Sequence, residues 1–229
     1  MVQVCKWCHL QRALCQQYYF HNIDGELVAP SYHKGNGKAE DWLLFESVNN
    51  VFITKVCLMA KALLCGIASI LAKEIAQSEL RIGSLGWNKK EPDVQHVTIR
   101  SVIFIGTQNG VRIKSWGRPS SGFVKEVIFQ NATMVDVQNP ILIDQNYCPS
   151  KKNCPSQVSG IKISDITYED IHGTSATQVA MKFDCSSTNP CKGIRLEDIK
   201  LTYRNQVAQA SCKHVGISDM KSVQPERCS

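Results

Sequence analysis

The chain has 229 residues, of which 43% are hydrophobic and 20% are charged, and its formal net charge is +6 at pH 7. This length and apolar content exclude a wholly disordered protein and predict a single domain with one sizeable core. The positive charge favours an acidic partner, either a polyanionic sugar, a nucleic acid or an anionic lipid surface. Because the sequence has no Lys/Arg-rich tract and no aromatic RNA-reading motif, we expect no nucleic-acid partner.

The first 22 residues form an atypical N-terminal segment without a visible targeting signal. Charged and aromatic residues between Lys6 and Arg12 interrupt the region where a signal peptide would be uninterrupted and apolar. Cys5 and Cys8 have CxxC spacing, but a metal site of this kind needs a second, similarly spaced pair, which the sequence lacks. We therefore expect neither a metal nor another cofactor.

Short strands are predicted from Ile23 to Thr54. Val48, Val51 and Ile53 are expected to face inward, and Asn49-Asn50 is expected to form a turn between strands. The following stretch breaks this pattern. Its apolar run is rich in Ala and Leu and is interrupted only by Lys61, which predicts a helical insert near 56–77. The run is short and charged for a bilayer span, so we expect no membrane partner.

An internal repeat indicates how the rest of the chain folds. An apolar pattern of the form V-x-I-x-x-V begins at Val97, Val127, Ile161 and Ile194, at intervals of roughly 30 residues. The copies predict matching polar bends at Asn131, Asp165 and Asp198. Because no helical pattern separates these strands, the repeat predicts an all-β solenoid of stacked parallel strands, a right-handed parallel β-helix. The alternative is a sandwich of hairpins, which would need frequent Asn-Gly or Asp-Gly turns.

Two cations in the stretch 107–116 form a candidate binding site. Arg112 and Lys114 flank Ile113, so in a strand both cations project from one face while Ile113 points into the core. A planar guanidinium and a compact ammonium can hold one sugar carboxylate from two sides. The alternative is an exposed edge strand that carries cations for solubility.

The cysteines favour an oxidising compartment. Six of the eleven form three locally spaced pairs, which are Cys148 with Cys154, Cys185 with Cys191, and Cys212 with Cys228. None of the six has CxxC spacing and no histidine is grouped with them, so disulfides are favoured over zinc. Asn131 begins an Asn-Ala-Thr sequon and is a candidate glycosylation site.

Five longer runs carry a resemblance to a known family. They are IGSLG at 82–86, GTQNGVRIK at 106–114, VQNPILIDQNYC at 137–148, IHGTSATQVAMKFDCS at 171–186 and LEDIKLTY at 196–203. From about Ile82 onward the chain resembles the plant polygalacturonases, the pectin hydrolases of glycoside hydrolase family 28. The resemblance implies a parallel β-helix that is secreted to the cell wall as a monomer and acts on pectic galacturonan. It also implies that Arg112 and Lys114 bind the galacturonate carboxylate and that Tyr147 is the family's active-site tyrosine.

The same resemblance implies catalytic motifs that this sequence lacks. Family members carry an NTD motif, a DD pair after a glycine and a GHG motif, and none of the three occurs in the 229 residues. Hydrolysis with inversion needs one carboxyl group as the acid and another as the base. We therefore assign no catalytic residue and predict an inactive copy. Read one base out of phase, codons permitted by Arg12–His21 and by Val56–Lys73 spell family-like sequence, which indicates a truncated and frameshifted copy.

These observations predict four segments. Residues 1–22 are atypical, 23–54 form N-terminal turns of the β-helix, 55–81 are a helical segment in place of the catalytic turns, and 82–229 form the C-terminal β-helix. The expected function is that of a polygalacturonase-family protein whose ancestral activity is hydrolysis of α-1,4-galacturonan. The alternatives are a non-catalytic pectin-binding protein and an incorrectly assigned transcript of a complete, active hydrolase.

Overall fold

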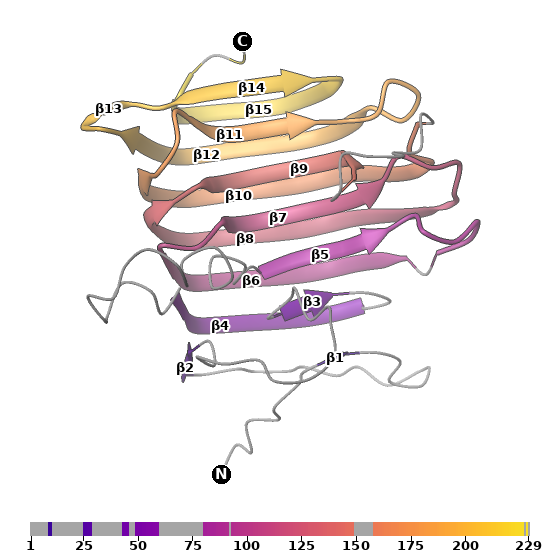
Figure 1. Ribbon diagram of the computed structural model, residues 1–229, viewed down its shortest axis with the longest axis horizontal. Coiled ribbons are helices and arrows are strands. Elements are labelled where there is room, and N and C mark those ends of the chain that lie inside the picture. Colours follow the sequence, from indigo (N-terminus) through magenta and orange to yellow (C-terminus); the bar gives the residue numbers. More distant parts are fainter. Residues whose placement is uncertain are drawn as a thin grey trace.

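The computed structural model describes residues 9–10, 25–28, 43–45, 49–59, 80–91, 93–148, 158–226 and 228, and all regular structure in them is β-strand. The strands form two sheets (Figure 1). The seven-stranded sheet contains, in order, β1 (His9–Leu10), β3 (Leu43–Phe45), β5 (Leu80–Leu85), β7 (Asn109–Trp116), β9 (Asn139–Tyr147), β11 (Val179–Asp184) and β14 (Gln209–Lys213). The eight-stranded sheet contains β2 (Gly25–Val28), β4 (Asn49–Met59), β6 (Val94–Ile105), β8 (Gly122–Val137), β10 (Ile161–Ser175), β12 (Cys191–Tyr203), β13 (Gln206–Val207) and β15 (Val215–Gln224).

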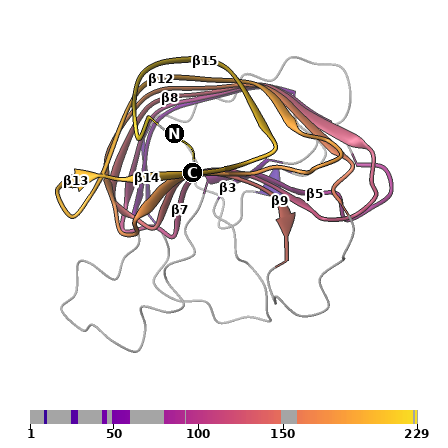
Figure 2. The same cartoon turned by 90° about the horizontal axis from the view of Figure 1, so that it is seen from above.

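Successive strands of the chain alternate between the two sheets from β3 to β12, so each coil of the chain adds one strand to each sheet. We call one such coil a rung. Neighbouring strands of a sheet are parallel, with the exception of the short pairing between β12 and β13. Figure 2, which looks down the stack, shows the strands of successive rungs superposed. This arrangement is a parallel β-helix.

The core lies between the two sheets and is built from apolar residues that stack from rung to rung. In the eight-stranded sheet, Val97, Val127, Ile166 and Ile194 occupy one continuous register and are all fully buried. The facing sheet contributes buried residues such as Ile113, Ile143 and Phe183 in the same way. Each buried side chain of this size stabilises the fold by about 1.5–3 kcal/mol relative to exposure. Stacking gives every interior rung apolar neighbours above and below.

The long strands of the eight-stranded sheet bend at polar residues in the left-handed backbone region. Ser101, Asn131, Asp170 and Asp198 have φ between +49° and +56° and lie at equivalent positions of β6, β8, β10 and β12. Asn and Asp tolerate this region better than other residues with side chains. Asn131, the sequon residue, is exposed at its bend.

The expected match of Asp165 with Asn131 and Asp198 is wrong. Ile166 pairs with Val127, so Asp170 lies opposite Asn131. Asp165 instead lies in a second row of left-handed residues with His96 and Glu126. The sequence misled because the apolar pattern fits β10 twice, starting at Ile161 or at Ile166. Only pairing with the neighbouring strand selects the second register.

Two local expectations near the N-terminus are corrected. Val56–Met59, the start of the expected helical insert, belong to β4 and pair in parallel with both β2 and β6. The expected turn at Asn49-Asn50 is the first part of the same strand, with Asn49 opposite Gln95. Pairing on both sides overrides the helical propensity of the sequence. Residues 60–77 of the expected insert, and most of 1–22, lie outside the described residues.

Disulfides join segments at the edges of the rungs. Cys185 is bonded to Cys191 across the connection from β11 to β12, and Cys212 of β14 is bonded to Cys228. Cys148 is also disulfide-bonded, and its expected partner, Cys154, lies outside the described residues. The part of the chain that the structure describes contains no helix long and apolar enough to cross a bilayer.

One polar atom in the core has no partner. Tyr168 is fully buried, its ring stacks on Phe129 with 5.2 Å between centroids, and Phe183 lies 5.9 Å away. Among the described residues nothing forms a hydrogen bond with its hydroxyl, and burial raises the pKa of Tyr168 well above its ordinary value. Leaving a buried hydroxyl unpaired costs about 1–3 kcal/mol.

We therefore expect Tyr168→Phe to leave the free energy of unfolding unchanged or to raise it by about 1 kcal/mol, because the ring stack remains and the unpaired hydroxyl is removed. Phe129→Ala, the control, removes the stacked ring and is expected to cost about 3–5 kcal/mol. Urea unfolding followed by circular dichroism measures both variants. A clear loss of stability in Tyr168→Phe would contradict the assignment of an unpaired hydroxyl.

Candidate functional site

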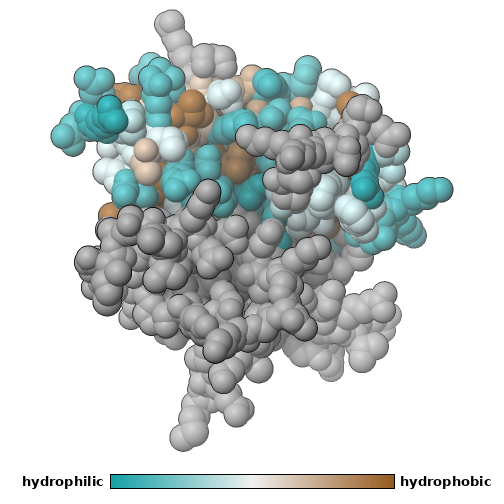
Figure 3. Space-filling model, in the orientation of Figure 1, coloured by the Kyte–Doolittle hydropathy of each residue, from teal (hydrophilic) through white to brown (hydrophobic). Residues whose placement is uncertain are grey.

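The cation pair, Arg112 and Lys114, lies on β7 inside the seven-stranded sheet. β7 pairs with β5 on one side and β9 on the other, so the alternative of an exposed edge strand is wrong. Ile113 is fully buried in the core, and the alternation of the strand turns Arg112 and Lys114 to the opposite face. Where Figure 3 shows this face, hydrophilic side chains predominate over hydrophobic ones.

The structure brings both cations to the same aromatic ring. The guanidinium carbon of Arg112 lies 5.3 Å from the ring centroid of Tyr147, and Nζ of Lys114 lies 4.0 Å from it. Cations at such distances are attracted by the electron-rich face of the ring. The three residues expected to bind the sugar acid are therefore neighbours. Both cations are largely buried, since Lys114 is only 1% exposed and the Arg112 side chain 11%.

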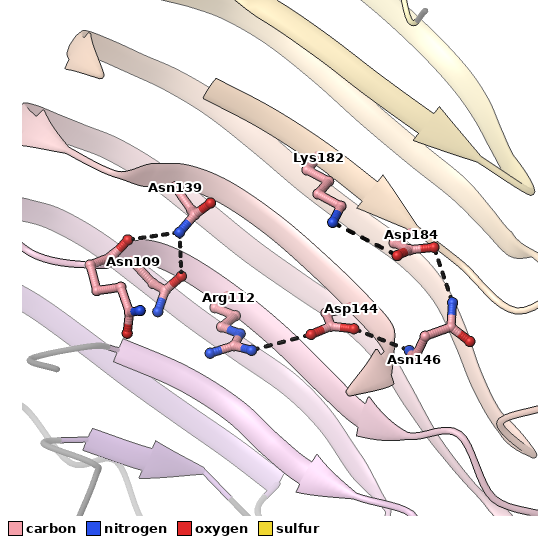
Figure 4. Close-up of polar contacts among 8 residues, drawn as sticks. Asn109, Arg112, Asn139, Asp144, Asn146, Lys182 and Asp184 are labelled. Carbon is pink, nitrogen blue, oxygen red and sulfur yellow. Dashed lines mark hydrogen bonds and ion pairs between the residues drawn. The ribbon is translucent and has the colours of Figure 1, made fainter. Parts of the chain in front are cut away.

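Sequence reasoning missed the carboxylate beside the cation pair. Nη2 of Arg112 donates to Oδ2 of Asp144 over 3.2 Å, as Figure 4 shows. Asp144 lies on β9 directly opposite Lys114, and Asp184 of β11 lies opposite Asp144. The signal was present in the sequence, since Asp144 and Asn146 share one period-two face of β9. Tyr147 has the opposite parity and lies opposite Trp116 because the register between β7 and β9 shifts after Lys114.

Asn146 links the two aspartates. Its backbone N–H donates to Oδ1 of Asp144 over 3.1 Å, and its side-chain amide donates to Oδ1 of Asp184 over 3.0 Å (Figure 4). Nζ of Lys182 lies 3.8 Å from the other oxygen of Asp184. A continuous polar network thus runs along this face from Arg112 to Lys182. This network holds the carboxylate of Asp144 against the guanidinium of Arg112, which is the group expected to bind a ligand carboxylate.

Two glycines permit the close packing behind the site. Gly83 has φ of +96°, and a Cβ there would collide with the backbone carbonyl of Lys114. At Gly110 a Cβ would collide with the carbonyl of Pro140. Glycine at these positions lets β5 and β9 approach β7 closely enough to fix the backbone that carries the cation pair.

Burial dominates the electrostatics of Asp144. Loss of solvent raises the pKa of this carboxyl, and the opposing effects of the Arg112 guanidinium and of the Asn146 N–H are smaller. The nearby carboxylate of Asp184 raises the pKa further. The folded state therefore favours the protonated form of Asp144 relative to the unfolded chain.

This direction predicts how stability depends on pH. With the folded-state pKa above the unfolded value of 3.8, the contribution of Asp144 to stability is fully present below that value and is lost as the pH rises through the folded-state pKa. Asp144→Asn cannot titrate, so we expect the wild type to lose stability relative to this variant as the pH rises from 3.8 through the folded-state pKa. Urea unfolding of both proteins across this range tests the expectation. If the stability of the wild type relative to the variant stays constant or increases as the pH rises, the expectation is contradicted.

One group of described residues has metal-ligand geometry, away from the cation pair. Ligand atoms of Asp170, His172 and Asp198 lie within 4.8 Å of one another on the eight-stranded sheet. Nζ of Lys200 lies 2.7 Å from Oδ1 of Asp198, so a cation of the chain already contacts that carboxylate. The hydrogen bond from Lys200, followed by the attraction of His172, lowers the pKa of Asp198. These contacts form an ion-pair network at the bends of β10 and β12.

Comparison with known proteins identifies a family whose model matches this chain. The model of the glycosyl hydrolases family 28 matches residues 79–223. A polygalacturonase of Prunus persica is 62% identical over 149 residues, which cover 65% of this chain and 38% of that protein. Polygalacturonase-2 of Solanum lycopersicum is 44% identical over 147 residues, which cover 64% of this chain and 32% of that protein. The match thus spans well under half the length of these relatives.

A solved structure supports the fold. The endo-xylogalacturonan hydrolase of Aspergillus tubingensis superposes with a TM-score of 0.60 at 16% sequence identity, over 77% of this chain and 45% of that one. At this identity the likeness concerns the path of the chain alone. It agrees with the two parallel sheets described above.

Proposed function

This chain belongs to the glycosyl hydrolases family 28, and from that premise we propose that Arg112, Lys114 and Tyr147 bind galacturonate residues of pectic α-1,4-galacturonan. The observation that carries the proposal is the convergence of two cations on one aromatic ring, 4.0 Å and 5.3 Å from its centroid, inside the matched region. Relatives that match this region are named polygalacturonases.

The chemistry of the three residues suits a sugar acid. A carboxylate can accept from the planar guanidinium of Arg112 and from the ammonium of Lys114 at once, and the ring of Tyr147 offers an apolar surface to the C–H groups of a sugar. Low exposure strengthens these charge interactions, because the local dielectric is lower than that of water. In this arrangement the ligand carboxylate shares Arg112 with Asp144.

The proposal is binding without hydrolysis. The NTD, DD and GHG motifs are absent from the 229 residues. Of the carboxylates beside the cation pair, Asp144 is held by Arg112, and Asp184 by Asn146 and Lys182. Cleavage with inversion needs a protonated carboxyl group and a second one that activates water. Positioning a sugar without these groups does not break its glycosidic bond at a useful rate.

The same premise extends to the whole chain. We propose a right-handed, incomplete parallel β-helix with N-terminal rungs at 23–54 and a C-terminal part at 82–229, preceded by the atypical segment 1–22. In this view 55–81 stand where the catalytic rungs of the family belong. Secretion to the cell wall as a monomer is consistent with the disulfides and with the exposed sequon at Asn131.

The first experiment separates binding from cleavage. The 229-residue protein is incubated with polygalacturonate, and reducing ends are measured beside the affinity for trigalacturonate by calorimetry. We expect binding that weakens with added salt and no release of reducing ends above a no-protein blank. Sustained release of reducing ends would contradict the proposed absence of catalysis, and absence of binding would contradict the proposed site.

A variant pair locates the binding. The double substitution Arg112→Gln with Lys114→Met is expected to weaken trigalacturonate binding by at least tenfold, or about 1.4 kcal/mol, because it removes both charge-assisted hydrogen bonds. Lys182→Met is the matched control, since Lys182 lies on the same face and its side chain is 47% exposed. Its loss should change affinity less than twofold if binding is local to the pair. Equal losses in both proteins would indicate a diffuse charge effect.

A transcript that restores the missing motifs in frame would encode a complete hydrolase instead. The out-of-phase resemblance of Val56–Lys73 to family sequence favours examining this alternative. Sequencing the message across this segment distinguishes the two.

A further inference from the structure

A row of aromatic rings continues from Tyr147 to two tryptophans at the ends of neighbouring strands. Trp116 ends β7 opposite Tyr147, with 5.0 Å between ring centroids, and Trp87 follows β5, with 4.9 Å between its ring and that of Trp116. The three rings therefore cross the carboxyl ends of three neighbouring strands. Since adjacent strands are spaced by about 4.8 Å, the row extends roughly 10 Å along the stack.

A second cation lies at the far end of this row. The guanidinium carbon of Arg118 is 3.9 Å from the centroid of the Trp87 ring and 5.7 Å from that of Trp116. Among the described residues no carboxylate forms an ion pair with Arg118, in contrast to Arg112 with its partner Asp144. The row thus has a cation and an aromatic ring at each end.

The backbone holds Arg118 in place. Its N–H donates to the carbonyl of Trp116 over 2.9 Å, and its carbonyl accepts from the N–H of Gly160 over 3.0 Å and from the hydroxyl of Ser120 over 3.2 Å. Its Nη1 lies 3.5 Å from the carbonyl of Trp87. A guanidinium that is already positioned loses less conformational entropy when it binds a carboxylate.

Trp87 gives the row an accessible surface. Trp87 is 53% exposed, whereas the large apolar residues of the core are at most a few per cent exposed. An exposed indole beside an arginine presents an apolar face and a carboxylate-binding fork together. A uronic-acid residue carries the complementary pair of groups, a C–H face and a carboxylate.

We propose that Trp87 and Arg118 form a second subsite, which takes an acidic sugar residue of the same chain whose neighbouring residues lie at Arg112, Lys114 and Tyr147. The inference rests on the proposed function and adds to it a dependence on ligand length. A ligand that ends at Tyr147 does not reach Arg118, and a longer oligomer spans both ends of the aromatic row. In this subsite Arg118 binds the carboxylate of the acidic sugar residue, and Trp87 contacts its sugar ring.

The test compares oligogalacturonates of two lengths, a dimer and a pentamer, by calorimetry. Trp87→Ala and Arg118→Gln are expected to weaken binding of the pentamer about tenfold and binding of the dimer less than twofold. Trp87→Phe should retain most of the affinity because it keeps an aromatic surface. Methyl-esterified pentamer should be nearly insensitive to Arg118→Gln, since the ester cannot accept the charge-assisted pair.

The matched control is Arg204→Gln. Arg204 lies 5.1 Å above the ring of Tyr203, so it is the same type of surface cation–π contact, and it is far along the stack in the connection after β12. Its substitution removes the same charge and should leave pentamer affinity within twofold. If Arg118→Gln and Arg204→Gln have equal effects, the charge acts non-specifically and the subsite is refuted.

The outcomes separate this inference from the proposed function. If the wild type binds both oligomers and Trp87→Ala binds the pentamer as tightly as the wild type does, the second subsite is refuted while the first stands. If the wild type binds neither oligomer, the second subsite and the proposed function are both refuted. A loss that is equal for dimer and pentamer also overturns the inference, because it shows that Trp87 and Arg118 act on the first subsite.

Discussion

Parallel backbone pairing between successive rungs is the constraint on which the structure depends. Each interior strand is hydrogen-bonded on both sides, so a residue's position along the stack determines which residues of neighbouring rungs lie beside it. This pairing aligns the apolar core positions, places Asp144 opposite Lys114 and brings Tyr147 opposite Trp116. The candidate site is therefore a consequence of register, and an error of one residue would turn its side chains to the wrong face.

The sequence was sufficient to predict an all-β architecture of parallel strands and the strand that carries Arg112 and Lys114. Period-two alternation around Ile113 correctly placed the two cations on one face, and recurring apolar patterns predicted parallel stacking. The register of β10 was not predictable, because its apolar pattern fits two alignments equally well and only contact with β8 distinguishes them. The strand at Val56–Met59 was missed for a related reason, since its local composition favours a helix and only its neighbours impose the extended form.

The site itself was predicted in part. Proximity of Arg112, Lys114 and Tyr147 was implied by family resemblance, but their low exposure and the carboxylate of Asp144 required the structure. A buried ion pair at a binding site has two effects. It fixes the orientation of the guanidinium before a ligand arrives, and it opposes a ligand carboxylate through repulsion and competition. The proposed binding would therefore select a carboxylate presented together with a sugar ring, because a small free anion gains only the charge interaction.

The left-handed bends of the long strands restrict which sequences can evolve at these sites. A β-branched residue at Asp170 or Asp198 would be strained by a φ near +50°, whereas glycine, asparagine and aspartate adopt this conformation at low cost. Gly193, opposite Asp165 in the second row, is a glycine with φ of +65°. The backbone conformation at the bends thus disfavours β-branched residues even though the side chains are solvent-accessible. Surface position and mutational freedom are decoupled along these two rows.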